Sequence, residues 1–73
     1  MKKGIDALTA RELQVLQSAA RGESARETAK GLGLALDTVK DHRNAARNRL
    51  DARNVTHAVA MLAAAGIVEA GAA

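Results

Sequence analysis

Three polar side chains, those of Lys40, Asp41 and Asn44, have the types and the spacing to hydrogen-bond the edges of paired bases. At 100° per residue along a helix, Asn44 falls within about 40° of Lys40, and Asp41 lies further round the same side. Lysine matches guanine O6 and N7, asparagine matches adenine N6 and N7, and a carboxylate accepts from cytosine N4. If residues 36–50 form a helix with this side exposed, these three residues are candidate contacts to DNA bases.

Asp41 has a second interpretation, because a carboxylate also repels the phosphates that flank every base pair. In that case Asp41 would only weaken binding to DNA of any sequence. The residue type alone leaves both interpretations open, and we favour cytosine recognition.

Cationic and hydroxyl side chains in and just after the same segment are candidate contacts to DNA phosphates. The alternative is that some of them pair with Asp37 and Asp51 inside the domain. One of the arginines borders the expected core side of the helix, which favours a structural role for that residue. The candidates are Thr38, Arg43, Arg47 and Arg53, with Arg49 beside them and Arg43 as the residue that borders the core.

The charge of the chain fits a nucleic-acid partner without requiring one. Eleven Lys and Arg against eight Asp and Glu give a net charge of +3, and the isoelectric point is near 10.0. A positive surface attracts phosphate, although small domains also carry such a charge for solubility. The segment 37–53 mixes acids with its bases, so we expect it to be only mildly positive and its binding to depend weakly on salt.

The sequence offers no arrangement of residues for catalysis. It has no cysteine, and its two histidines, His42 and His57, are too far apart for a metal site. No nucleophile and base stand at a plausible spacing, and no strand precedes the glycines at 31 and 33, which argues against a phosphate-binding loop. We therefore expect no metal, no cofactor and no enzymatic activity; a small enzyme is the interpretation with the least support.

The chain is expected to fold as one all-α domain of four helices. Thr9-x-x-Glu12 and Ser24-x-x-Glu27 are capping boxes that mark two helix starts. The glycines at 31 and 33 supply the left-handed backbone of the tight turn in a helix-turn-helix. The expected helices span about 9–21, 24–31, 36–50 and 55–65, in a domain of residues 8–68 that follows a partly disordered arm (1–7) and precedes a frayed tail (69–73).

Helical periodicity predicts which sides of these helices are buried. In the first helix Leu16 belongs to the buried stripe, and Ser18 is expected to face water. In the third, Val39, Ala46 and Leu50 lie on one line toward the core. This line is opposite the polar side, so the helix 36–50 would have one side buried in the core and one side exposed for hydrogen bonding.

The fourth helix carries more apolar surface than it needs to pack on its own domain. Asn54 or Thr56 caps it, and no charged residue lies between His57 and Glu69. The chain has no Phe, Tyr or Trp, so its core is thin and a partner subunit would add to it. We expect a homodimer through side chains of this helix, namely Val59, Met61, Leu62 and Ala65.

Four blocks of sequence run in register through residues 8–62. They are Leu8-Thr9-x-Arg11-Glu12-Leu13-x-Val15-Leu16, Gly22-x-Ser24-x-x-Glu27-x-Ala29, Thr38-Val39-Lys40-x-His42-Arg43 and Leu50-x-x-Arg53-Asn54-x-Thr56-x-Ala58-Val59. Together they resemble the LuxR/GerE-type helix-turn-helix family, and a chain of this length is similar to its small stand-alone members. Four spaced blocks are far more specific than any one of them.

The resemblance implies a four-helix domain whose third helix lies in the major groove of DNA and whose fourth helix packs against its counterpart in a two-fold dimer. Members of the family typically control transcription initiation from inverted half-sites. The implied partners are double-stranded DNA, a second copy of the chain and RNA polymerase. We accordingly expect a cytoplasmic, nucleoid-associated bacterial regulator that does not enter a membrane, since the longest apolar stretch, 58–65, is too short to span one.

Some positions depart from the family pattern. Ala35 stands where the family has Ser or Thr, so the third helix lacks its usual N-cap unless Asp37 substitutes. Asp51 replaces a frequent glycine and must adopt the backbone that ends a helix. Ala45 and Ala46 have small side chains, so fewer apolar atoms are packed beneath the third helix. The acids of that helix also motivate the alternative function, a protein-binding module of the same fold that contacts a transcription factor or an RNA polymerase subunit.

Overall fold

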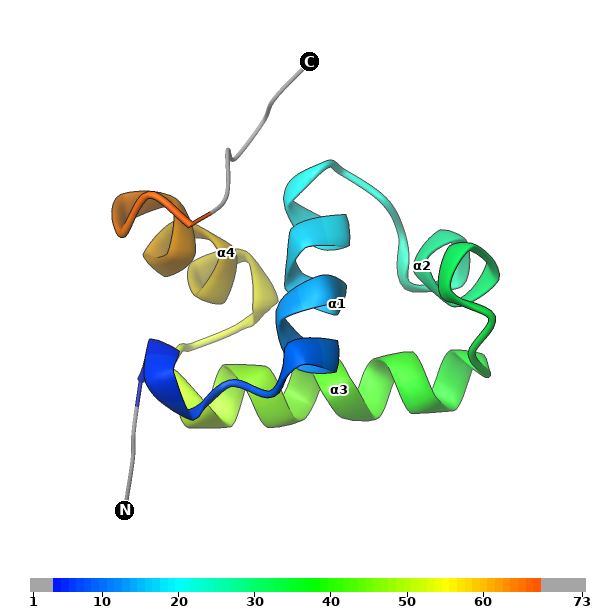
Figure 1. Ribbon diagram of the computed structural model, residues 1–73, viewed down its shortest axis with the longest axis horizontal. Helices are drawn as coiled ribbons and strands as arrows, with labels where there is room; N and C mark the ends of the chain where they lie inside the picture. Colours follow the sequence, from blue (N-terminus) through cyan, green and yellow to red (C-terminus); the bar gives the residue numbers. More distant parts are fainter. Residues whose placement is uncertain (1–3, 68–73) are drawn as a thin grey trace.

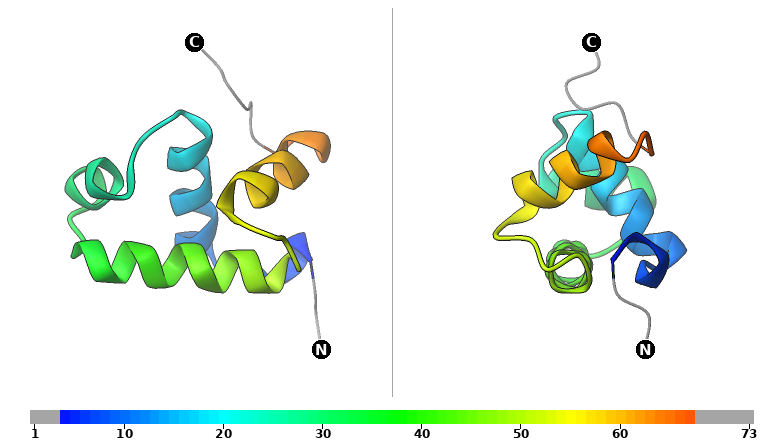
Figure 2. Two further views of the ribbon diagram at one scale, coloured as in Figure 1. Left: turned by 180° about the vertical axis from the view of Figure 1, so that it is seen from behind. Right: turned by 90° about the vertical axis from the view of Figure 1, so that its left-hand side faces the viewer.

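The computed structural model describes residues 4–67, and every regular element within that range is helical. Figure 1 shows α3 along one edge of the molecule with the other three α-helices on one side of it, and both views in Figure 2 agree. The expected all-α fold of four helices is confirmed. In chain order the elements are the 3-10 helix η1 (Ile5–Ala7) and the α-helices α1 (Ala10–Ala20), α2 (Ala25–Leu32), α3 (Leu36–Arg49) and α4 (Val55–Ala64).

Reciprocal capping boxes start α1 and α2, as the sequence predicts. The backbone N–H of Glu12 donates to Thr9 Oγ1 at 3.1 Å, and the Thr9 N–H donates to the Glu12 carboxylate at 3.0 Å. Ser24 and Glu27 repeat this pair of bonds at the start of α2. Each box satisfies two amides that have no partner inside the helix, which fixes where the helix begins.

The turn between α2 and α3 depends on one glycine. Gly33 has φ 68° and ψ 33°, in the left-handed region that costs glycine nothing. The next amide, of Leu34, donates to Ala29 O at 2.9 Å and closes the end of α2. Gly31 lies inside α2, so only the second of the two predicted turn glycines takes the left-handed backbone. The turn sets the direction in which α3 leaves α2.

Two apolar clusters hold the helices together. The larger one joins α1, α3 and α4, and the smaller one joins α1, α2 and α3. The three residues predicted to line the core side of α3 are all buried, with 0 to 3% of their surface exposed. The larger cluster contains Leu16, Ala20, Ala46, Leu50, Ala52, Ala58, Val59 and Leu62, and the smaller one contains Val15, Ala29 and Val39.

Ser18 does not face water, so that prediction from periodicity is wrong. Its side chain is buried, with 2% exposed, and its hydroxyl donates to Glu23 Oε1 at 2.6 Å. Because a serine has a single hydroxyl proton, the contact of 2.5 Å between Ser18 Oγ and Thr28 Oγ1 must be donated by Thr28. A polar position at the α1–α2 junction is thus part of the interior because both hydroxyls have partners.

The chain before α1 is tied to the far end of α3. Gly4 N donates to Arg49 O at 2.9 Å, and residues 5–7 of the expected arm form η1. The rest of the expected arm (1–3) and of the expected tail lie outside the described residues. Within 4–67, no helix combines the length and the apolar character needed to cross a membrane.

Candidate nucleic-acid interface

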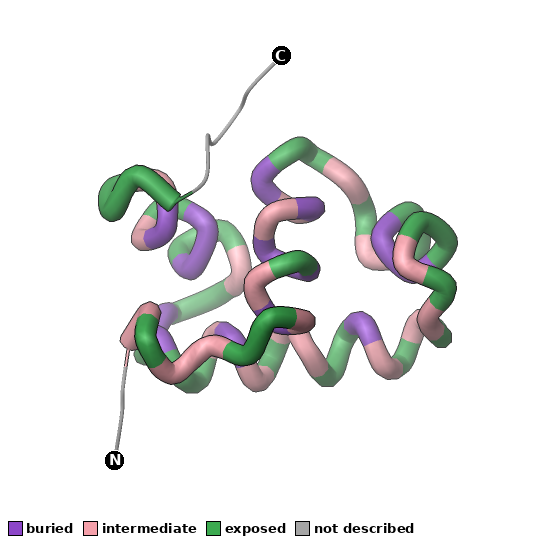
Figure 3. The backbone as a smooth tube through the Cα atoms, viewed as in Figure 1, coloured by how far each residue is buried: buried purple, intermediate pink, exposed green. Residues whose placement is uncertain are grey.

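The three predicted base-contacting residues, Lys40, Asp41 and Asn44, are all exposed on α3. Their side of the helix is turned away from buried Val39 and Ala46, and Figures 1 and 2 show no other helix over it. In Figure 3 the buried and exposed parts of α3 alternate along its length, as an amphipathic helix requires. None of the three side chains forms a hydrogen bond or ion pair with residues 4–67, so their hydrogen-bonding groups are available to a ligand.

The geometry of α2 and α3 is that of a helix-turn-helix. Both helices pack on α1, through the hydrogen bond between Ser18 and Thr28 for α2 and through the shared cluster for α3. In such a motif the second helix enters the major groove while the first lies across the backbone. The turn between α2 and α3 leaves the exposed side of α3 open to a ligand.

The candidate phosphate contacts occupy different surroundings. Thr38 is half-buried in the first turns of α3. Arg47 is also half-buried, and its Nη1 donates to Ala52 O at 3.4 Å, which leaves part of the guanidinium free at the surface. Arg53 is exposed in the loop before α4, where its backbone N–H donates to His57 Nδ1 at 3.0 Å. Its side chain has no partner within the described residues.

Arg43 points inward, away from the exposed side of α3. Its Nη2 donates to the backbone oxygen of Glu23 at 3.1 Å, and its Nε is buried with no hydrogen-bond partner among residues 4–67. The side chain therefore links α3 to the loop between α1 and α2. This placement favours the structural role of Arg43 over a contact to phosphate.

The ion pairs of the described residues use the glutamates of α1 and its following loop rather than Asp37 or Asp51. Arg49 Nε lies 2.9 Å from Glu12 Oε1, and the Glu12 side chain is only 4% exposed. Arg21 Nε lies 2.9 Å from Glu23 Oε2. Arg49 is thus committed to holding α3 on α1, and it contributes less to the charge of the exposed side than sequence counting suggests.

The pKa of the Glu23 carboxyl is lowered by its hydrogen bonds. Its hydrogen bond from Arg21 is the main cause, followed by the hydrogen bond from Ser18, and together they hold its pKa below the ordinary value of 4.5. Both bonds favour the charged form of the carboxylate. At neutral pH this carboxylate therefore holds the loop between α1 and α2 on the end of α1.

The exposed side of α3 is close to electrically neutral. It carries Lys40 against Asp37 and Asp41, all exposed. Arg47, whose guanidinium is partly free, adds one positive charge to this side, whereas Arg49 pairs with Glu12 and Arg43 points inward. Binding to DNA through this side would therefore depend on hydrogen bonds to bases more than on attraction to phosphate.

The side chains expected to form a dimer divide into two groups. Leu62 is fully buried and Val59 is 9% exposed, because both pack in the cluster of α1, α3 and α4. They are therefore not on the outer surface of α4. Met61 is half-buried and Ala65 is exposed, and with exposed Ala60 and Ala64 they form the outer side of the helix.

The comparisons with known proteins agree with this geometry. The family model described as "Bacterial regulatory proteins, luxR family" matches residues 6–62. This chain belongs to the luxR family of bacterial regulatory proteins. The matched family is one of DNA-binding regulatory domains, which are not a class of enzyme, and the match includes α2 and α3.

A similar protein is YhjB of Escherichia coli (strain K12), provisionally named an HTH-type transcriptional regulator. It is 37% identical over 60 residues, which make up 82% of this chain and 30% of that protein. This chain therefore spans less than a third of the length of the relative it matches. The similarity includes the helix-turn-helix and leaves most of the relative without a counterpart in this sequence.

Two exposed cations of α2 are not among the contacts predicted from the sequence. Arg26 and Lys30 stand four residues apart on α2 and share one side of it. Their spacing in the sequence is the signal that could have shown them, since the first helix of a helix-turn-helix crosses the DNA backbone and presents such residues to phosphate.

No metal-binding group of three His, Cys, Asp or Glu residues occurs in residues 4–67.

Proposed function

We propose that this luxR-type chain is a sequence-specific, double-stranded DNA-binding regulator of transcription that inserts α3 into the major groove. In this proposal Lys40, Asp41 and Asn44 contact base edges, while Thr38, Arg47 and Arg53 contact phosphates. The chain would act in the cytoplasm, at the bacterial nucleoid, where its DNA target lies. RNA polymerase is a further proposed partner.

One observation carries the proposal. The outer side of α3 presents an ammonium group, a carboxylate and an amide that have no partner in residues 4–67, on a helix held by a luxR-type turn. Polar groups at a protein surface need no ligand, but this combination matches the donors and acceptors of guanine, cytosine and adenine in the major groove. The near-neutral charge of this side also favours base recognition over general affinity for phosphate.

The direct test is selection of duplexes from a randomised library by the purified chain, followed by affinity measurements at several salt concentrations. We expect one enriched motif, and we expect Lys40→Ala and Asn44→Ala each to lose about 5- to 150-fold of preference at one base pair. Gln14→Ala, on the exposed side of α1, is the control and should keep the motif. Absence of binding to every duplex at low salt, together with capture of a transcription protein, would instead support the protein-binding alternative.

Asp41 is proposed to select cytosine by accepting a hydrogen bond from its N4 amino group. Asp41→Ala should then lose preference at a single base pair by about 5- to 150-fold while the rest of the motif is kept. The matched control is Asp37→Ala, which removes another exposed carboxylate of α3 and should change affinity for all sequences alike. If Asp41→Ala behaves as this control does, with a uniform gain in affinity, cytosine recognition is refuted.

We also propose that two copies pair through the outer side of α4 and bind half-sites about one helical turn, roughly 10 bp, apart. The small side chains of Ala60, Ala64 and Ala65 would let two such helices approach closely, with Met61 at the edge. Ala64→Arg should shift the chain to monomer in analytical ultracentrifugation and weaken binding to paired half-sites. Gln14→Arg adds the same charge on α1 and should leave pairing intact; a wild-type chain that is monomeric on a single half-site would contradict the dimer.

A further inference from the structure

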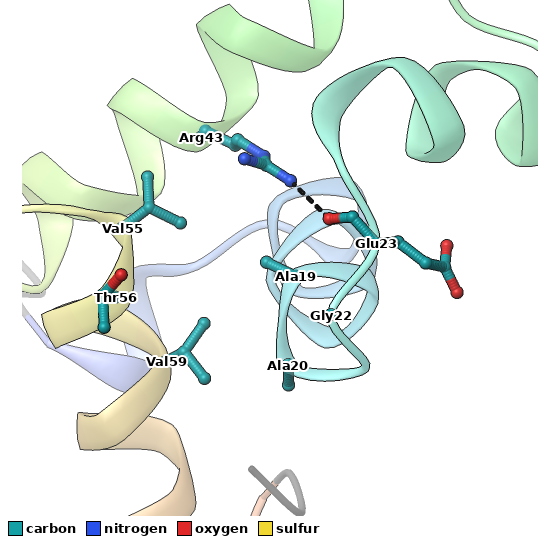
Figure 4. Close-up of a pocket in the computed structure, with 8 residues that line it drawn as sticks. All are labelled: Ala19, Ala20, Gly22, Glu23, Arg43, Val55, Thr56 and Val59. Carbon is teal, nitrogen blue, oxygen red and sulfur yellow. Dashed lines mark hydrogen bonds between the residues drawn. The ribbon is translucent and has the colours of Figure 1, made fainter. Parts of the chain in front are cut away.

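An open hollow of about 350 Å³ lies between the end of α1, the start of α4 and the inward side of α3. Figure 4 shows Arg43 entering it from α3, with the helices α1 and α4 on either side. Aliphatic and polar groups share its walls about equally. The lining residues are Ala19, Ala20, Gly22, Glu23, Arg43, Val55, Thr56 and Val59.

The guanidinium of Arg43 is the unusual feature of this hollow. It donates one hydrogen bond within residues 4–67, from Nη2 to the Glu23 backbone oxygen, and its Nε is buried without an acceptor. The ion pairs found in those residues do not include it. A buried donor with no acceptor is destabilising, and arginine has five donors in a planar fork that fits a carboxylate.

The carboxylate of the neighbouring Glu23 does not accept a hydrogen bond from Arg43. Glu23 uses its side chain on Arg21 and Ser18, and Figure 4 shows that carboxylate pointing away from the hollow while the backbone oxygen faces Arg43. Arg43 is therefore a cation with unused hydrogen-bonding capacity beside aliphatic walls. The apolar part of the wall includes Val59 and Ala20, which are 9% and 7% exposed.

We propose that this hollow binds a small organic carboxylate with a short aliphatic group. The carboxylate would accept hydrogen bonds from the Nη groups of the Arg43 guanidinium, which donate only one within residues 4–67, and the aliphatic group would lie between Val59, Val55 and Ala19. The volume is at the small end of the range for ligand pockets, which suits a ligand of few atoms. The site is separate from the exposed side of α3, so it goes beyond the proposed DNA binding and is tested without DNA.

The test is titration of the ¹⁵N-labelled chain with isobutyrate at constant ionic strength, followed by amide and arginine Nε–H chemical shifts. We expect saturable shifts at Arg43 Nε and at the amides of Ala19, Gly22 and Val59, with a dissociation constant in the millimolar range. Isobutyramide has the same shape without the charge, and inorganic phosphate has the charge without the aliphatic group. Both should bind at least about tenfold more weakly.

Two variants locate the site. Arg43→Met removes the charge and should weaken isobutyrate binding at least about tenfold, whereas Arg26→Met, the same change on the exposed side of α2, should not. Ala19→Leu fills the hollow with Arg43 left in place and should also abolish the saturable shifts, so the proposal remains testable if Arg43→Met fails to fold. Shifts that do not saturate, equal binding of the amide or of phosphate, or binding that survives Ala19→Leu would each overturn it.

Discussion

At the scale of single residues, the two ends of α3 are built with residues that do not favour those positions. Ala35 is the N-cap, with φ −69° and ψ 149°, and no side chain caps the helix there, so Asp37 does not substitute. Asp51 follows the helix with φ 55°, a left-handed backbone that glycine takes more easily. The departures noted in the sequence are therefore real weaknesses of the helix that presents the base-contacting residues.

Ala35→Ser should stabilise the domain. The backbone at this position is already that of an N-cap, so a hydroxyl could accept from the amides of the first turn and raise the free energy of unfolding by about 1 kcal/mol. Urea denaturation followed by circular dichroism measures this. Ala45→Ser, in the middle of α3, is the control and should give no gain; equal effects of the two variants would show that the missing cap is not what limits the helix.

At the scale of elements, polar contacts decide how the helices sit on each other. The Glu12–Arg49 pair holds α3 on α1. A series of side-chain hydrogen bonds, from Arg21 to Glu23, Ser18 and Thr28, holds α2 on α1. These contacts hold α2 and α3 on α1 and so help to fix the orientation of the exposed side of α3. They involve few residues, so single substitutions can test them.

The Arg49→Met substitution should destabilise the domain by about 1 to 2 kcal/mol, because it leaves the Glu12 carboxylate, 4% exposed, with only a backbone amide as partner. The estimate is kept low because the Arg49 side chain is 44% exposed and water screens the pair. The measurement is urea denaturation. Arg53→Met removes an exposed arginine and should stay within about 0.5 kcal/mol of the parent; a similar loss in both variants would argue against the pair.

The contribution of Glu23 should depend on acidity. Since the pKa of its carboxyl is lowered in the folded chain, its stabilisation is present above the unfolded value near 4.5 and is lost as the pH falls through the folded value. Glu23→Gln should therefore melt at a lower temperature than the parent at pH 7, and the two melting curves should converge toward pH 3. A difference that stays constant down to pH 3 would show that charge on Glu23 does not matter.

The sequence predicts those parts of the structure that follow from local rules. Capping boxes and glycine place the helix starts and the turn, and periodicity identifies Val39 and Leu50 as buried and Lys40 as exposed. It does not reveal that Ser18 is buried, because that depends on a hydroxyl partner ten residues away in another helix. The partner of Arg49, 37 residues away, is hidden for the same reason, so sequence counting overstated the positive charge near α3.

At the scale of the whole molecule, the core is small and unevenly distributed. It contains no aromatic residue, and most of its buried side chains join α1, α3 and α4. The helix α2 is attached through Val15, Ala29 and Val39 together with the Ser18–Thr28 contact. The helix expected to lie across the DNA backbone is thus the one with the least apolar attachment.

This uneven core implies that the domain opens in stages rather than all at once. Amide hydrogens of α2 should exchange with deuterated solvent through a partial opening of low free energy, while those in the middle of α1 and α3 should exchange only on global unfolding. Because α2 can open alone, its angle can adjust to curved or irregular duplexes while α3 keeps its position.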